Sequence, residues 1–116
     1  MNTYNGHVIK VVDGDTFDAL VELGFGVTQK FRIRLDGINT PENHTDEGVR
    51  ASEFVRELIE NKSVKLIEAK NKDKFGRALA KVQMEDGQDL TDYLIKEGLG
   101  YEYHGGKKIF ALTLLS

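Results

Sequence analysis

The chain has 116 residues, with 16 Lys or Arg against 19 Asp or Glu, so its formal net charge is −3. This length favours a single domain over residues 1–116 that buries a core without crosslinks. The absence of cysteine excludes disulfides, thiolate zinc sites and a cysteine nucleophile. No run approaches the roughly 20 apolar residues of a membrane span. The first residues show no signal-peptide pattern, so we expect an intracellular protein without a membrane partner.

The charge is unevenly distributed along the chain. Residues 62–81 contain seven basic residues and two acidic ones, whereas the segments on either side have an acidic excess. Because salt screens exposed charges beyond about 10 Å, a local basic segment can bind a polyanion even in an acidic protein. The alternative is a solvated, lysine-rich strand and loop.

Three strands joined by short turns are predicted for the first third of the chain. A β-branched run predicts the first strand over residues 8–12, before an Asp-Gly-Asp turn. Partial alternation predicts the second over 17–23. After a Gly-Phe-Gly turn, alternation of apolar with basic side chains predicts the third over 27–35.

The hydrophobic period then changes to that of a helix over residues 45–61, with Thr45 as its N-cap. Two more strands are predicted over 63–69 and 79–84, followed by a helix over 89–97. This order predicts a mainly β fold, a five-stranded OB-fold barrel with a helix between strands three and four and a C-terminal helix. We expect the abbreviated, apolar tail over 105–116 to form a short terminal helix or to be poorly ordered.

The turn Asp13-Gly14-Asp15-Thr16 brings two carboxylates within two residues of each other. Carboxylate oxygens are the ligands preferred by hard cations such as Ca²⁺. An ordinary polar turn is the alternative.

The third predicted strand places Arg32 and Arg34 on one face, because side chains alternate along a strand. The planar fork of arginine suits phosphate. The loop that follows carries Asn39, Thr40 and Glu42, and a carboxylate there can accept a proton from water. The alternative is the exposed face of an edge strand followed by a Thr-Pro turn.

Two further segments carry aromatic side chains suited to nucleotides. Lys74 and Phe75 precede a glycine and Arg77 inside the basic segment, which suits ring stacking and phosphate contacts. Tyr101 and Tyr103 are two residues apart, so an extended segment turns both rings to one side. An exposed hairpin and ordinary packing of the two tyrosines are the alternatives.

Taken in order, segments 13–16, 34–42, 73–77 and 98–99 resemble the staphylococcal nuclease family. The similarity extends over about residues 6–103. It implies an OB-fold and Ca²⁺-dependent endonuclease activity that hydrolyses phosphodiester bonds of DNA and/or RNA to 3′-phosphate products. We expect a monomer acting on single-stranded DNA or RNA.

The resemblance also implies a role for each matching residue. Asp15 would be a carboxylate ligand of Ca²⁺, and Thr40 would offer its backbone carbonyl to the same ion. Glu42 would orient or deprotonate the attacking water, while Arg34 and Arg77 would hold the phosphate and stabilise the transition state. The substrate-binding rim would comprise Lys74, Phe75, Tyr101 and Tyr103.

Asn39 departs from the family pattern, which has an aspartate metal ligand at this position. The amide oxygen can still bind Ca²⁺, but one negative charge is lost, so we expect weaker metal binding. This departure and the short C-terminus leave an alternative function open. The chain would then be a non-catalytic OB-fold module that binds nucleic acid or a protein.

Overall fold

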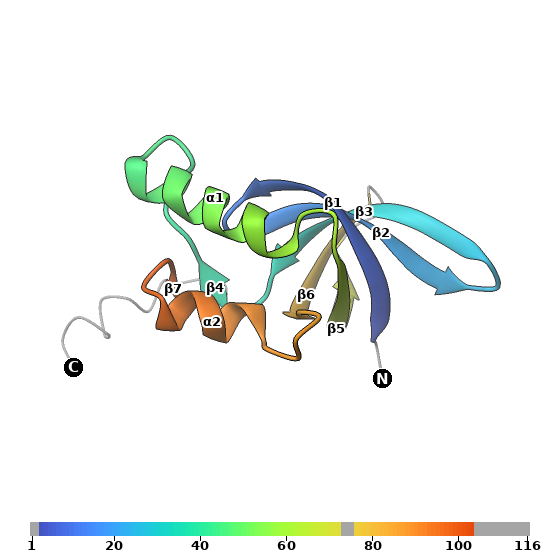
Figure 1. The fold of residues 1–116 in the computed structure, drawn as a ribbon. Coiled ribbons are helices and arrows are strands. Elements are labelled where there is room, and N and C mark those ends of the chain that lie inside the picture. The colour runs from blue at the N-terminus through green and yellow to red at the C-terminus, as the bar shows by residue number, and fades with distance from the viewer. Residues whose placement is uncertain (1–2, 73–75, 104–116) are drawn as a thin grey trace.

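The computed structural model describes residues 3–72 and 76–103. Five strands form a closed barrel in the spatial order β1, β2, β3, β6, β5 (Figure 1). β3 and β6 pair in parallel, and the other neighbours pair antiparallel. Their bounds are Tyr4–Asp13 for β1, Thr16–Gly24 for β2, Val27–Leu35 for β3, Ser63–Asn71 for β5 and Arg77–Gln83 for β6.

Two helices complete the predicted architecture. α1 (Asp46–Ile59) connects the first three strands to β5, and α2 (Leu90–Lys96) follows β6. The predicted five-stranded OB-fold barrel, with a helix between its third and fourth strands, is therefore confirmed. The predicted tail over 105–116 lies outside the described residues.

A second, two-stranded sheet was not predicted. β4 (Ile38–Asn39) pairs antiparallel with β7 (Tyr101–Glu102), which brings Asn39 opposite Tyr101. Strands of two residues are too short to show alternation, so the sequence carries no signal for them. Their pairing joins the segment after β3 to the segment after α2.

Alternation along β3 separates the core from the outer surface of the barrel. Ile33 and Leu35 are each 1% exposed and pack inside the barrel with the other buried apolar side chains. Arg32 and Arg34 therefore project outward from the same strand. The apolar interior fixes the register of β3, since a shift by one residue would bury both arginines.

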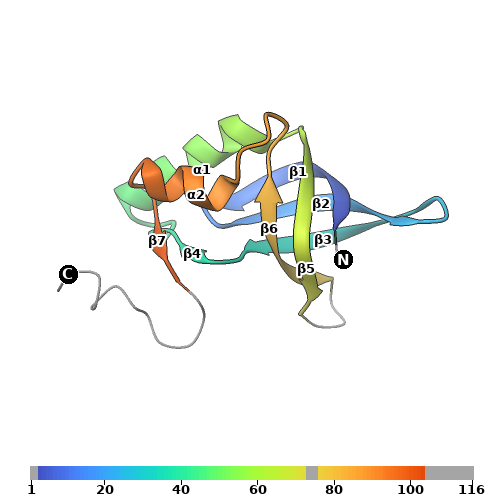
Figure 2. The same cartoon turned by 90° about the horizontal axis from the view of Figure 1, so that it is seen from below.

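The helices cover one end of the barrel, and the β2–β3 hairpin extends at the other end (Figures 1 and 2). α1 buries Ala51, Val55 and Ile59, and the Phe54 ring stacks on Tyr93 of α2 with centroids 5.8 Å apart. Neither helix in the described part of the chain is long and apolar enough to cross a membrane.

Candidate active site

A polar hollow of about 500 Å³ lies where β3 ends. The β1–β2 turn and the segment from residue 39 to residue 43 form its walls, and β7 adds one aromatic side chain. Its lining residues are Asp13, Asp15, Thr16, Arg34, Asn39, Thr40, Pro41, Glu42, Asn43 and Tyr101. The hollow therefore brings together the predicted residues Asp15, Arg34, Asn39, Thr40, Glu42 and Tyr101.

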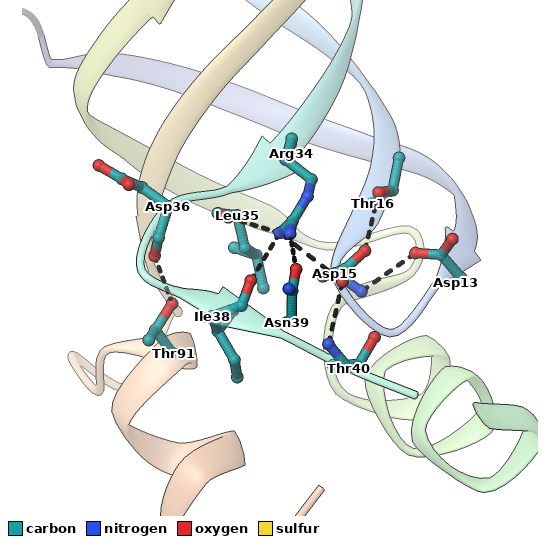
Figure 3. Close-up of polar contacts among 10 residues, drawn as sticks. All are labelled: Asp13, Asp15, Thr16, Arg34, Leu35, Asp36, Ile38, Asn39, Thr40 and Thr91. Atoms are coloured by element: carbon teal, nitrogen blue, oxygen red, sulfur yellow. Dashed lines mark hydrogen bonds and ion pairs between the residues drawn. The ribbon is translucent and has the colours of Figure 1, made fainter. Parts of the chain in front are cut away.

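Asp15 joins the two walls of this hollow (Figure 3). Its Oδ1 accepts a hydrogen bond from the Thr16 hydroxyl at 3.0 Å, and its Oδ2 accepts one from the Thr40 backbone N–H at 3.0 Å. Its backbone carbonyl accepts a hydrogen bond from the Leu35 N–H at 2.8 Å. These bonds hold the carboxylate at a fixed position beside the end of β3.

The Asp13 and Asp15 carboxyls have opposite pKa shifts. Burial, a hydrogen bond with Asp15 and the Asp15 charge raise the pKa of Asp13 to about 6. Burial also acts to raise the pKa of Asp15, but hydrogen bonds from Asp13 and Thr40 and the charge of Arg34 outweigh it, so that pKa is lowered. Two neighbouring carboxylates resist holding two negative charges, and Asp15 is the one that stays ionised.

Arg34 is held by the backbone that follows it. Its Nη1 donates to the carbonyls of Leu35 at 2.8 Å and Ile38 at 2.7 Å, and its Nη2 donates to the Asn39 Oδ1. Nη1 also lies 3.6 Å from the Asp15 Oδ2. Among the described residues, the Nε–H and one Nη2 N–H of Arg34 have no protein acceptor, so the fixed guanidinium retains two donors for a ligand.

The first turn of α1 fixes the backbone at Glu42. The Glu42 carbonyl accepts hydrogen bonds from the Thr45 N–H at 3.0 Å and from its hydroxyl at 2.7 Å. The same Thr45 oxygen accepts a hydrogen bond from the Gly48 N–H at 3.0 Å, which confirms the predicted N-cap. The Glu42 side chain is exposed at the hollow.

Three glycines allow other elements to pack directly on the segment 38–42. A Cβ added at Gly14 would lie 2.8 Å from the Thr40 hydroxyl oxygen, and one at Gly100 would lie 2.7 Å from Ile38. At Gly48 an added Cβ would come within 2.5 Å of the carbonyl carbon of Glu42. The turn between β1 and β2, the start of α1 and the residue before β7 thus all contact this segment without side chains.

The other predicted residues lie outside this hollow. Arg77 is opposite Arg32 in the β3–β6 pairing and lines a separate hollow of about 570 Å³. Tyr103 does not line the polar hollow, and its N–H donates to the Gly37 carbonyl at 3.0 Å. Two predicted substrate-binding residues, Lys74 and Phe75, are outside the described residues.

Four lining residues were not predicted as site residues: Asp13, Thr16, Pro41 and Asn43. Asp13 belongs to the same Asp-Gly-Asp turn as Asp15, so the two carboxylates of this turn already indicated it in the sequence. Asn43 donates to the Val12 carbonyl at 3.1 Å and accepts from the Ser52 hydroxyl at 2.7 Å. Its position depends on the packing of α1 on β1, which local sequence does not indicate.

The donor set of the hollow suits a hard cation with few charged ligands. Its side chains and carbonyls offer oxygen atoms. Burial is the main cause of the raised pKa of Asp13, and the Asp15 charge adds to it, so a cation would offset part of the cost of ionising both carboxyls. Within the described ranges, no three His, Cys, Asp or Glu side chains cluster closely enough to hold a metal ion. A cation here would therefore depend on neutral oxygens and water as well as on carboxylates.

The family model and the related proteins that match this chain point to the same family. The sequence model described as "Staphylococcal nuclease homologue" matches residues 32–110, well over half of the chain. An "Uncharacterized endonuclease" of Escherichia coli is 28% identical over 99 residues, which cover 85% of this chain and 61% of that protein. The "Micrococcal nuclease" of Shigella flexneri is 32% identical over 112 residues, which cover 88% and 61%.

A plant relative shows the same similarity over a shorter stretch. The "Staphylococcal-like nuclease CAN1" of Arabidopsis thaliana is 30% identical over 77 residues, which cover 66% of this chain and 23% of that protein. The chain thus spans about three fifths of the bacterial relatives above and less of the plant one. Its sequence match and its closed barrel agree, and the chain belongs to the staphylococcal nuclease homologue family.

Proposed function

We propose that this chain is a Ca²⁺-dependent nuclease that hydrolyses phosphodiester bonds of DNA and/or RNA to 3′-phosphate products. The observation that carries the proposal is the fixed Arg34 guanidinium, which shares one hollow with the Asp15 and Glu42 carboxylates. An anchored cation and an exposed carboxylate are the groups that phosphodiester hydrolysis requires. The nuclease names of several relatives support the same class of reaction.

Arg34 has the geometry for stabilising a transition state. Hydrogen bonds to the carbonyls of Leu35 and Ile38 and to the Asn39 side chain hold the guanidinium before substrate arrives, so little reorganisation is needed during the reaction. Its remaining donors can contact phosphate oxygens as charge develops on them. Arg77, on the adjacent strand, lies two positions along the pairing from Arg34 and supplies the second cation for the phosphate.

Glu42 is assigned to the attacking water. Its exposed carboxylate can accept the proton as the water oxygen bonds to phosphorus. The bond from phosphorus to the 5′ oxygen then breaks, which leaves a 3′-phosphate and a 5′-hydroxyl that takes its proton from solvent. The backbone bonds to Thr45 fix the position of the loop. Asp15, the Asn39 amide oxygen and the Thr40 carbonyl would hold the Ca²⁺ ion. When bound, that ion would supply positive charge to the phosphate.

A Ca²⁺ titration of hydrolysis tests this function. Purified protein is incubated with denatured DNA, and separately with RNA, over tenfold steps of Ca²⁺ and with a chelator. Hydrolysis is expected to rise with Ca²⁺, to stop with chelator and to leave 3′-phosphate ends. Absence of cleavage on both substrates at every Ca²⁺ concentration would contradict the proposal.

Asn39 favours one alternative, a non-catalytic module that binds nucleic acid or a protein. Its Oδ1 already accepts a hydrogen bond from Arg34, and it adds no negative charge for a cation. Under this alternative, single strands bind in a salt-dependent way but are not hydrolysed at any Ca²⁺ concentration. Strand binding and hydrolysis measured on the same preparation separate the two functions.

A further inference from the structure

We propose that the outer face of β3 continues the nucleic-acid site beyond the reaction centre, with Lys30 and Arg32 binding phosphates next to the one that is cleaved. This inference rests on the proposed function for its substrate class, a nucleic-acid strand. It adds residues that bind the strand without touching the reacting phosphate.

The placement of the three basic residues follows from the pleat of β3. Lys30, Arg32 and Arg34 alternate with the inward-facing Phe31 and Ile33, so all three project from the outer face. Two residues along a strand cover roughly 7 Å, which is comparable with the spacing of successive phosphates in an extended strand. The row therefore leads from the reaction centre along the barrel.

A second hollow of about 570 Å³ accompanies this row. Its lining residues are Asp18, Lys30, Arg32, Gly76 and Arg77. Three of these five residues are basic and one is acidic. Arg32 and Arg77 are direct partners in the β3–β6 pairing. The hollow thus places Lys30 and Arg32 beside Arg77, one of the two arginines proposed to hold the cleaved phosphate.

Arg32 is oriented by a buried carboxylate. Its Nε donates to the Asp18 Oδ1 at 2.9 Å and its Nη2 donates to Oδ2 at 3.2 Å. The Asp18 side chain is 7% exposed, whereas that of Arg32 is 51% exposed. Because Asp18 occupies the Nε–Nη2 edge, the guanidinium still offers its Nη1–Nη2 edge as a fork for phosphate.

The charges around Asp18 exceed what one carboxylate needs for neutrality. A hydrogen bond and the charge of Arg32 lower the pKa of Asp18, and the charges of Lys30 and Lys10 lower it further. Three cations thus act on one carboxylate. Asp13 is the further acid that acts on Arg32, so the local charge remains positive.

Binding of single-stranded DNA of 3 and 12 nucleotides, measured by fluorescence anisotropy in chelator over a series of salt concentrations, tests this extension. Lys30→Gln and Arg32→Gln should each weaken 12-mer binding about fivefold, the effect of one exposed phosphate contact. Each should also lower the salt slope by about 0.7, the value for one contact with a single strand. Binding of the 3-mer should weaken less.

Three further variants separate phosphate binding from stability. Lys96→Gln removes an exposed lysine from α2 that lines neither hollow, and should leave 12-mer binding unchanged. Arg32→Lys retains the charge without the fork, so it should bind the 12-mer between wild type and Arg32→Gln. The double variant Asp18→Asn with Arg32→Gln removes the unpaired buried charge and should bind as weakly as Arg32→Gln alone.

The outcomes distinguish this proposal from the nuclease proposal. Weaker 12-mer binding by both β3 variants supports the extension, even if the wild-type protein hydrolyses nothing with Ca²⁺. Unchanged affinity and salt slope in both variants overturn it, even if hydrolysis is normal. A wild-type protein that binds no strand also overturns it.

Discussion

Replacing Gly48 by alanine tests whether packing of α1 fixes the position of Glu42. A Cβ at residue 48 would lie 2.5 Å from the carbonyl carbon of Glu42 and 2.9 Å from the carbonyl oxygen of Pro41, whereas ordinary contact begins at 3.4 Å. Because the Cβ would lie closer still to the carbonyl oxygen of Glu42, the backbone there must retreat by more than about 1 Å. Backbone atoms cannot turn away as a flexible side chain does, so the whole segment has to move.

The expected effect falls on turnover more than on helix formation. A misplacement of about 1 Å can cost roughly 10²-fold in rate when a group must be aligned for reaction. Alanine is up to about 1 kcal/mol more favourable than glycine in a helix, so helix propensity alone would make Gly48→Ala more stable even in the first turn. Lower activity together with unimproved stability would show that the clash outweighs propensity.

The assay compares Ca²⁺-supported hydrolysis of denatured DNA by Gly48→Ala, by Val49→Ala and by wild type, with circular dichroism to monitor α1. Val49 is the next residue of the same helical turn and its side chain is 45% exposed, so its truncation should leave the rate unchanged. Wild-type turnover by Gly48→Ala would refute the reasoning. Equal losses in both variants would indicate that the helix, rather than the contact with Glu42, is responsible.

Three further substitutions test other parts of the structure. Asn39→Asp should raise Ca²⁺ affinity about tenfold in calorimetry, because it adds a negative ligand charge beside Arg34; unchanged affinity would remove residue 39 from the metal site. Thr45→Ala should lower the free energy of unfolding by about 1 kcal/mol through loss of the N-cap, and Thr45→Ser should restore it. Asp18→Asn should lower that free energy by about 1–2 kcal/mol at pH 7 in urea titrations, because Arg32 loses its charged partner. The difference in free energy of unfolding between wild type and Asp18→Asn should persist above the unfolded-state pKa of about 3.9. It should vanish as the pH falls through the lowered native pKa of Asp18, and a difference independent of pH would contradict the ion pair.

The barrel was predictable because its signals are local. Alternation in β3 determines which side chains enter the core, and the helical period after Thr45 marks α1 with its cap. The pairing of β4 with β7 was not predictable, because it joins residues over 60 positions apart through strands of two residues. Tertiary packing, rather than propensity, creates that small sheet.

The candidate site was predictable in composition and less so in geometry. The Asp-Gly-Asp turn and the loop after Arg34 were both identified, and the structure brings them to one hollow. The hydrogen bonds of Arg34 to backbone carbonyls depend on the sharp turn at Gly37, where φ is +88°, and the sequence did not indicate them. The contact of Gly48 with Glu42 depends on how α1 packs, so it also required the structure.

The most direct test of the nuclease assignment is a comparison of Glu42→Gln with Glu53→Gln. Both replace an exposed glutamate, but only Glu42 lines the polar hollow, while Glu53 lies on α1. With saturating Ca²⁺ and denatured DNA, Glu42→Gln should lose about 10²- to 10⁴-fold in kcat, the range for a general base, and Glu53→Gln should retain wild-type kcat. Wild-type kcat in Glu42→Gln, or an equal loss in both variants, would contradict the account.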